Sequence, residues 1–94
     1  MANANLSGAN LSYAAMNSAT LINANLQSAN LFNAYLIEAN LQNANLYLAD
    51  LTDAILTNAN LYLADLYYAN LTDTVLTGAT MPDGSIYDGS LPGP

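Results

Sequence analysis

The side chains with the clearest chemical potential are seven carboxylates, and the chain has no Lys, Arg, His or Cys beside them. Paired carboxylates can perform general acid–base catalysis, and clusters of them can bind Ca²⁺. The repeat described below brings Asp50, Asp53 and Asp73 to one face, which we expect to be convex and open to water. A narrow column offers no pocket to shift their pKa values, and the chain contains no EF-hand or glycine-rich calcium repeat. We therefore expect a non-enzyme with no catalytic residue, metal site or cofactor, in which the trio forms a solubilising acidic face.

The net charge of −7 narrows the classes of partner further. A chain without basic residues cannot make phosphate contacts that release counterions, so we expect no direct nucleic-acid binding and no membrane-surface binding. No apolar span of about twenty residues and no signal peptide is apparent. The cytoplasm is therefore the default compartment, although a mature protein of the thylakoid lumen or periplasm would have the same features.

A five-residue repeat dominates the chain. Sixteen consecutive units run from Leu6 to Met81, each centred on Leu or Met with Ala two places earlier, and only Thr74 departs from Ala. On an α-helix, each step of five residues would turn the centre by roughly 140°, and a straight strand would place alternate Ala residues on opposite faces. Both conflicts disappear if the chain bends after every Ala-x-Leu. Each unit then forms a short extended side and a two-residue corner, with Ala and Leu pointing inward.

Departures from the repeat indicate how many sides close one coil. The residue before the centre is usually Asn, Asp or Thr, and its apolar exceptions are spaced by twenty: Ala15, Tyr35, Ile55 and Val75. A second similarity, between Asn43–Leu51 and Asn58–Leu66, has an offset of fifteen and would suit a three-sided coil. We prefer twenty because fifteen would scatter the apolar exceptions over different faces. The prediction is an all-β, quadrilateral solenoid with about four coils of 20 residues.

Asn and Asp form two further columns at this spacing. Side-chain amides stacked on neighbouring strands can form hydrogen-bonded ladders, so we expect these residues to bond to the coil above or below. The two columns are Asn5, Asn25, Asn45 and Asp65, and Asn10, Asn30, Asp50 and Asn70.

Tandem A-(N/D)-L-x-x units over residues 2–81 resemble those of the pentapeptide-repeat family. The resemblance implies a right-handed quadrilateral β-helix, in agreement with the period of twenty. Many members come from cyanobacteria, and most have no known biochemical activity. A minority resemble duplex DNA in shape and charge and act on type II topoisomerases.

We divide the chain into a repeat domain at 1–81 and a degenerate half-coil or C-terminal cap at 82–94. Pro82-Asp-Gly84 predicts a turn, and Ile86 and Leu91 keep the phase of the centres, with Gly84 and Gly89 at the Ala position. As a cap, this segment would cover the open C-terminal ladder edge, which otherwise invites pairing with another chain.

Outward-pointing apolar residues form the candidate interaction surface. Tyr35, Ile37, Ile55 and Val75 are expected on one flat face. Tyr47, Leu48, Tyr67 and Tyr68 are expected in neighbouring columns, with Tyr62 and Leu63 one side earlier. Such residues either stack across coils or bind another molecule, since large exposed apolar patches are uncommon on monomers.

These observations favour a non-catalytic scaffold that presents a rigid, acidic and partly aromatic surface to a protein partner. A related interpretation is self-association, by end-to-end stacking or as a face-to-face dimer. An alternative is a DNA-mimicking modulator of a type II topoisomerase or other DNA-binding enzyme. However, a 19 Å length of DNA carries about eleven charges, whereas this chain has seven over all faces. A third interpretation is a structural spacer, or a designed or excised repeat segment without a partner.

Overall fold

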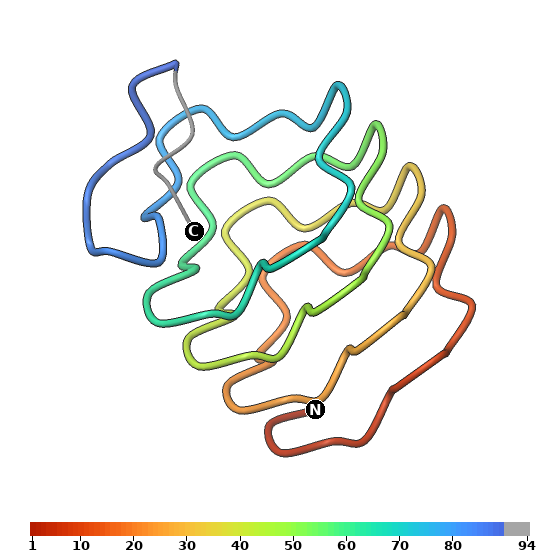
Figure 1. Ribbon diagram of the computed structural model, residues 1–94. Helices are drawn as coiled ribbons and strands as arrows, with labels where there is room; N and C mark the ends of the chain where they lie inside the picture. Colours follow the sequence, from red (N-terminus) through yellow and green to blue (C-terminus); the bar gives the residue numbers. More distant parts are fainter. Residues whose placement is uncertain (90–94) are drawn as a thin grey trace.

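The computed structural model describes residues 1–89 as a stack of coils (Figure 1). Its β-structure consists of isolated bridges rather than long strands, and each parallel bridge joins residues twenty apart. The pairs advance in steps of five, from Asn5 with Asn25 to Asn60 with Thr80. The predicted period of twenty is therefore the period of backbone pairing, and none of the bridges has the competing offset of fifteen. Across residues 1–89 there is no helix of the length and apolarity needed to cross a membrane.

Corners recur every five residues, at the positions that the repeat predicts. Each contains two turn residues between a centre and the next Ala, as Gln42 and Asn43 stand between Leu41 and Ala44. The N–H of that Ala donates to the carbonyl of the preceding centre; the distance between the Ala44 and Leu41 atoms is 3.0 Å. These bonds close the corner, while most of the remaining backbone N–H groups donate to carbonyls of the adjacent coils.

The second residue of each corner has left-handed backbone geometry. Positive φ at only the third residue of a four-residue turn with this hydrogen bond matches a type II turn, which favours Gly or Asn there. Gly8 and Gly78 meet this requirement. Fourteen other corners accept φ values of 56° to 63° without glycine, and they carry Asn3, Tyr13, Ser18, Asn23, Ser28, Asn33, Glu38, Asn43, Leu48, Asp53, Asn58, Leu63, Tyr68 and Asp73.

The core consists of the stacked Leu and Ala side chains. Every centre from Leu21 to Leu61 is at most 1% exposed, and the intervening Ala residues are equally buried. The inward orientation predicted for Ala and Leu is confirmed in these coils.

The predicted ladders of Asn and Asp are wrong. Their Oδ1 atoms instead accept a hydrogen bond from the backbone N–H two residues later, as Asn25 does from Gln27 at 3.0 Å. The same bond caps the corner after Asn45 and after Asp65. The corner leaves this N–H without a backbone acceptor, and the nearby side chain reaches it within its own coil. A side-chain bond between coils does occur elsewhere, from the N–H of Ile37 to Oδ1 of Asn17.

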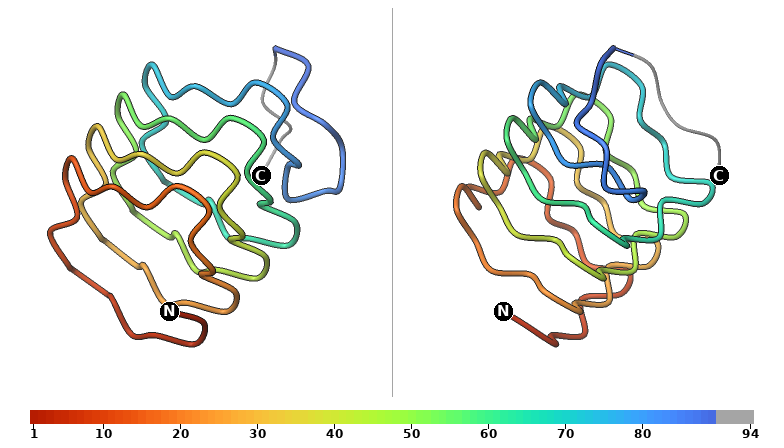
Figure 2. Two further views of the ribbon diagram at one scale, coloured as in Figure 1. Left: turned by 180° about the vertical axis from the view of Figure 1, so that it is seen from behind. Right: turned by 90° about the vertical axis from the view of Figure 1, so that its left-hand side faces the viewer.

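The chain leaves the repeat after Pro82. The carbonyl of Pro82 still accepts a hydrogen bond from the N–H of Leu63 in the previous coil. The N–H of Met81, however, donates to the carbonyl of Ser85, and Thr80 pairs with Ile86 in an antiparallel bridge. Figures 1 and 2 show this blue segment looping out beside the last coil. The prediction that Ile86 continues the buried centres is wrong, because the reversal leaves its side chain 59% exposed. Tyr87 packs against the core instead, and the expected centre Leu91 lies outside the described residues.

Candidate interaction surface

Six of the predicted surface residues lie on two consecutive corners and on the stacked corner one period earlier. We call them the tyrosine flank: Tyr47, Leu48, Tyr62, Leu63, Tyr67 and Tyr68. Tyr47 is partly buried and the other five are exposed, Tyr68 most of all at 75%. The structure thus places these six residues in the neighbouring columns that the period of twenty predicts.

Three rings of the tyrosine flank contact one another. Tyr47 meets Tyr68 of the next coil edge-to-face, with ring centroids 5.8 Å apart, and Tyr67 lies tilted against Tyr68 at 6.2 Å. Edge-to-face pairs of this kind contribute about 0.5–1.5 kcal/mol beyond the area they bury. The contact between Tyr47 and Tyr68 runs diagonally across the corner, because these residues are not twenty apart. It helps to hold the two coils in register, while most of the Tyr68 side chain remains in solvent.

Three of the four Leu and Tyr residues at left-handed corners of residues 1–89 lie in this flank, and the fourth, Tyr13, lies outside it. Leu48, Leu63 and Tyr68 occupy the left-handed corner position, which costs a bulky L-residue about 1–2 kcal/mol. Most other corners use Asn, Asp or Ser there, residues that tolerate this geometry better. Exposures of 49% for Leu48 and 56% for Leu63 mean that burial offsets only part of the cost. Such local conflicts are expected where a residue serves function rather than folding.

Asp65 belongs to the same surface, although we did not predict it as a site residue. The side that joins the two tyrosine corners carries Asp65 at its centre, exposed and facing outward, while Ala64 and Leu66 face the interior. Its Oδ1 accepts from the N–H of Tyr67 at 2.9 Å. The sequence contains a feature that could have identified Asp65. It is a charged residue in a column that otherwise contains Asn, and Tyr residues lie on both sides of it in the sequence.

The other predicted apolar group lies half a coil away. Bridges join Tyr35 to Ile55 and Ile55 to Val75, so these three residues stack in one column as the period of twenty predicts. Tyr35 and Val75 are exposed, whereas Ile55 and Ile37 are partly buried. A further aromatic pair was missed: the exposed Tyr13 packs edge-to-face on the partly buried Phe32, with ring centroids 5.7 Å apart. Tyr13 and Phe32 are nineteen residues apart, so they lie on the same corner of successive coils. The period of twenty could therefore have predicted this pair from the sequence.

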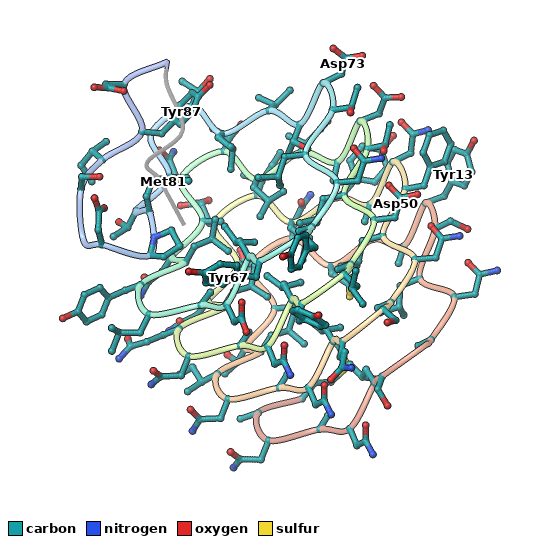
Figure 3. All side chains as sticks on the ribbon, viewed as in Figure 1. Tyr13, Asp50, Tyr67, Asp73, Met81 and Tyr87 are labelled. Atoms are coloured by element: carbon teal, nitrogen blue, oxygen red, sulfur yellow. The ribbon has the colours of Figure 1, made fainter. Side chains whose placement is uncertain are left out.

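The acidic face lies on another flank. Asp53 and Asp73 are exposed on equivalent corners twenty residues apart, and Asp50 stands on the side that precedes them. Figure 3 shows Asp50 and Asp73 on the same side of the stack as Tyr13, away from Tyr67. Among residues 1–89 no three acidic side chains come together as a metal site. Asp50 Oδ1 accepts from both the N–H and the hydroxyl of Thr52, so its ordinary role is to cap a corner.

Asp83 is the one described group with a clear pKa change. The Ser85 hydroxyl donates to its Oδ1 at 2.6 Å and the Ser85 N–H at 2.9 Å. These hydrogen bonds, the side-chain one first, lower the pKa of Asp83 by stabilising the carboxylate, and no nearby base is involved. The group is fully solvent-exposed and stabilises the turn at residues 82–85 rather than forming a reactive site.

Sequence comparison supports the repeat assignment directly. The family model described as "Pentapeptide repeats (8 copies)" matches residues 1–36, 29–66 and 44–83, which together span most of the chain. None of the curated proteins compared with the chain matches it.

Solved structures of cyanobacterial proteins resemble the coil. A pentapeptide repeat protein of Cyanothece 51142 (Rfr23) is 43% identical with a TM-score of 0.87, over 94% of this chain and 60% of its own. The protein alr5209 of Nostoc PCC 7120 is 40% identical with a TM-score of 0.76, over 77% and 60%. HetL of Nostoc sp. strain PCC 7120, described as involved in heterocyst differentiation regulation, is 44% identical with a TM-score of 0.56, over 92% and 42%.

This chain thus spans about 60% or less of these relatives. Their identity over most of its length agrees with the repeat match, with the twenty-residue pairing and with the buried Leu and Ala columns. The chain belongs to the pentapeptide-repeat family, a class of generally non-catalytic repeat scaffolds with a right-handed β-helix fold.

Proposed function

We propose that this chain is a protein-interaction scaffold that uses the tyrosine flank to bind another protein. In finer detail we propose a four-sided β-helix of about four coils at 1–81, capped by the segment that starts at residue 82. The cytoplasm is the default compartment of this proposal. The acidic residues of the neighbouring flank add solubility and favour a basic partner.

One observation carries the proposal: bulky residues stand at left-handed corners where the fold would be served better by Asn. Leu48, Leu63 and Tyr68 all do so within one flank. Their side chains are about half exposed or more, so packing explains only part of their presence. Aromatic residues are enriched at protein interfaces, where large and rigid side chains bury area at low entropic cost.

A different protein suits this flank better than a second copy. Every charged side chain of the molecule is acidic, so two copies would bring like charges together without any salt bridge between side chains. Self-association by end stacking or as a face-to-face dimer is therefore the weaker proposal. Sedimentation at several concentrations tests it, since a monomer at all of them is the expected result.

A triple variant tests the function of the flank without disturbing the coil. Leu48→Asn, Leu63→Asn and Tyr68→Asn together introduce the residue that equivalent corners already carry. The matched control, Tyr35→Thr with Val75→Thr, alters the apolar column half a coil away. Proteins retained from a cyanobacterial extract by the immobilised wild type are purified, and their Kd is measured for all three forms.

The expected result is a partner that binds the wild type and the control alike but binds the triple variant at least about tenfold more weakly, because truncated interface anchors commonly cost more than 1 kcal/mol each. Equal binding to all three forms would contradict the proposal. The proposal would also be contradicted if the wild type and the triple variant both inhibited supercoiling by gyrase. That result would assign the function to the acidic face.

A further inference from the structure

The outward-facing row between the two tyrosine corners has an unusual composition. It reads Tyr62, Leu63, Asp65, Tyr67, Tyr68, with Ala64 and Leu66 removed to the interior. Asp65 stands three residues after one aromatic ring and two residues before the next. Extended chain advances at most about 3.5 Å per residue, so the Cα atoms of Tyr62 and Tyr67 lie within about 11 Å of the Cα atom of Asp65.

The charge of Asp65 is not needed for the fold. Its corner bond to Tyr67 uses one oxygen, and Asn45 and Asn60 make the same bond to Tyr47 and Tyr62. The second carboxylate oxygen makes no hydrogen bond to any residue of 1–89 and faces solvent. Because the chain has no Lys, Arg or His, no side chain of its own can neutralise this charge.

The rings on either side are held in place by neighbouring structure. Tyr62 lies against the turn that follows Pro82, where a Cβ on Gly84 would come within 3.5 Å of its ring. Tyr67 is held by its contact with Tyr68, which in turn packs on Tyr47. Aromatic faces attract cations, and a carboxylate between them supplies the opposite charge and a hydrogen-bond acceptor.

We propose that Asp65, with Tyr62 and Tyr67 on either side, binds an arginine side chain of the protein partner. This inference rests on the proposed function and names the chemistry of its ligand. A guanidinium is planar and weakly hydrated, so it can stack on a tyrosine ring while donating to the free carboxylate oxygen. A second copy of the chain cannot supply this group. A divalent cation does not fit, because the described residues gather no cluster of acidic ligands here.

A titration followed by ¹H–¹⁵N NMR spectra tests the site directly. The probe is the peptide acetyl-Gly-Arg-Gly-Arg-Gly-Arg-amide, with the corresponding lysine peptide as a second arm, at low ionic strength. Asp65→Asn keeps the corner-capping oxygen and removes only the charge. Asp73→Asn is the matched control: it removes the same charge from the distant acidic face, in a column that already contains Asn33.

We expect the largest shift changes at residues 62–68, with Asp65→Asn weakening binding at least about tenfold. Tyr67→Leu should weaken it about two- to fivefold, as expected for an exposed cation–π contact. Asp73→Asn should have an effect of less than about twofold, and the lysine peptide should bind more weakly than the arginine peptide.

Equal weakening by Asp65→Asn and Asp73→Asn would show diffuse charge attraction and overturn the site. Shift changes confined to the acidic face would do the same. If the triple corner variant loses the protein partner while Asp65→Asn does not, the arginine inference fails and the proposed function stands. If both variants bind the partner as the wild type does, both fail.

Discussion

Replacing Asn25 by Ala or by Asp separates the observed corner cap from the amide ladder that the sequence had predicted. Asn25 Oδ1 accepts from the N–H of Gln27 at 3.0 Å, within the same coil. Its column neighbours are Asn5 and Asn45, so a new carboxylate would not meet another charge directly above or below it. A cap needs only an acceptor oxygen, whereas a ladder also needs the amide donors. Asp therefore preserves a cap and disrupts a ladder.

The magnitude follows from one neutral hydrogen bond at a solvent-exposed corner. Its loss in Asn25→Ala should reduce the free energy of unfolding by about 0.5–1.5 kcal/mol. For a domain of this size, 1 kcal/mol corresponds to about 4–8 °C in Tm. Asn25→Asp should remain within about 0.5 kcal/mol of the wild type, because the accepting oxygen and the side-chain volume are unchanged.

Urea unfolding followed by circular dichroism gives both free energies, and hydrogen exchange at the Gln27 amide reports on the cap itself. The Gln27 amide should exchange faster in Asn25→Ala and remain protected in Asn25→Asp. Equal destabilisation in the two variants would refute the cap and restore the ladder. Ile55→Ala is the control. The side chain of Ile55 offers no oxygen to the N–H of Thr57, so this variant should not change hydrogen exchange at the Thr57 amide through loss of a cap.

Three further predictions concern the core, a strained corner and the C-terminal turn. Leu41→Ala should lower the free energy of unfolding, measured in urea, by about 2–5 kcal/mol, because Leu41 is fully buried in the stack and a cavity would remain. A decrease of less than about 1 kcal/mol would contradict the stacked core. Leu63→Asn should leave stability unchanged within about 1 kcal/mol, since relief of left-handed strain offsets the lost partial burial, whereas Asn43→Leu at the equivalent corner should destabilise. Because the pKa of Asp83 is lowered in the folded chain, its support of the turn should be present above the unfolded pKa and be lost as the pH falls through the folded pKa. The Ser85 amide shift should follow that titration, and Asp83→Asn, which keeps an acceptor oxygen, should abolish it.

The arrangement of the coil could be predicted from the sequence because a bend after every Ala-x-Leu is the geometry that keeps both residues facing inward. Ala-x-Leu requires an extended side, and the apolar exceptions Tyr35, Ile55 and Val75 indicate the residues that pair. Those rules depend on burial and on backbone hydrogen bonding, which act identically in every unit. The stacking of the tyrosine flank follows from the same period.

What the sequence could not provide was the direction of individual polar side chains and of the chain end. The column spacing of Asn is compatible with a ladder, and only the corner geometry shows that the N–H two residues later is nearer. Ile86 keeps the phase of the repeat but not its orientation, because the turn at Pro82-Asp-Gly84 reverses the chain before it. Left-handed φ at Leu48 and Leu63 was likewise hidden, since neither residue favours it.

Disulfide formation between introduced cysteines tests the twenty-residue coil most directly, because the chain contains no native cysteine. Thr57 and Thr77 occupy equivalent positions on adjacent coils, and the N–H of Asn58 donates to the carbonyl of Thr77 at 2.9 Å. Paired backbones lie about 4.8 Å apart, within the Cα separation that a disulfide spans. Thr57→Cys with Thr77→Cys should therefore oxidise readily to a disulfide without loss of fold, whereas Thr57→Cys with Thr72→Cys, an offset of fifteen, should not. Efficient cross-linking of the second pair and none of the first would contradict the coil and every surface assigned from it.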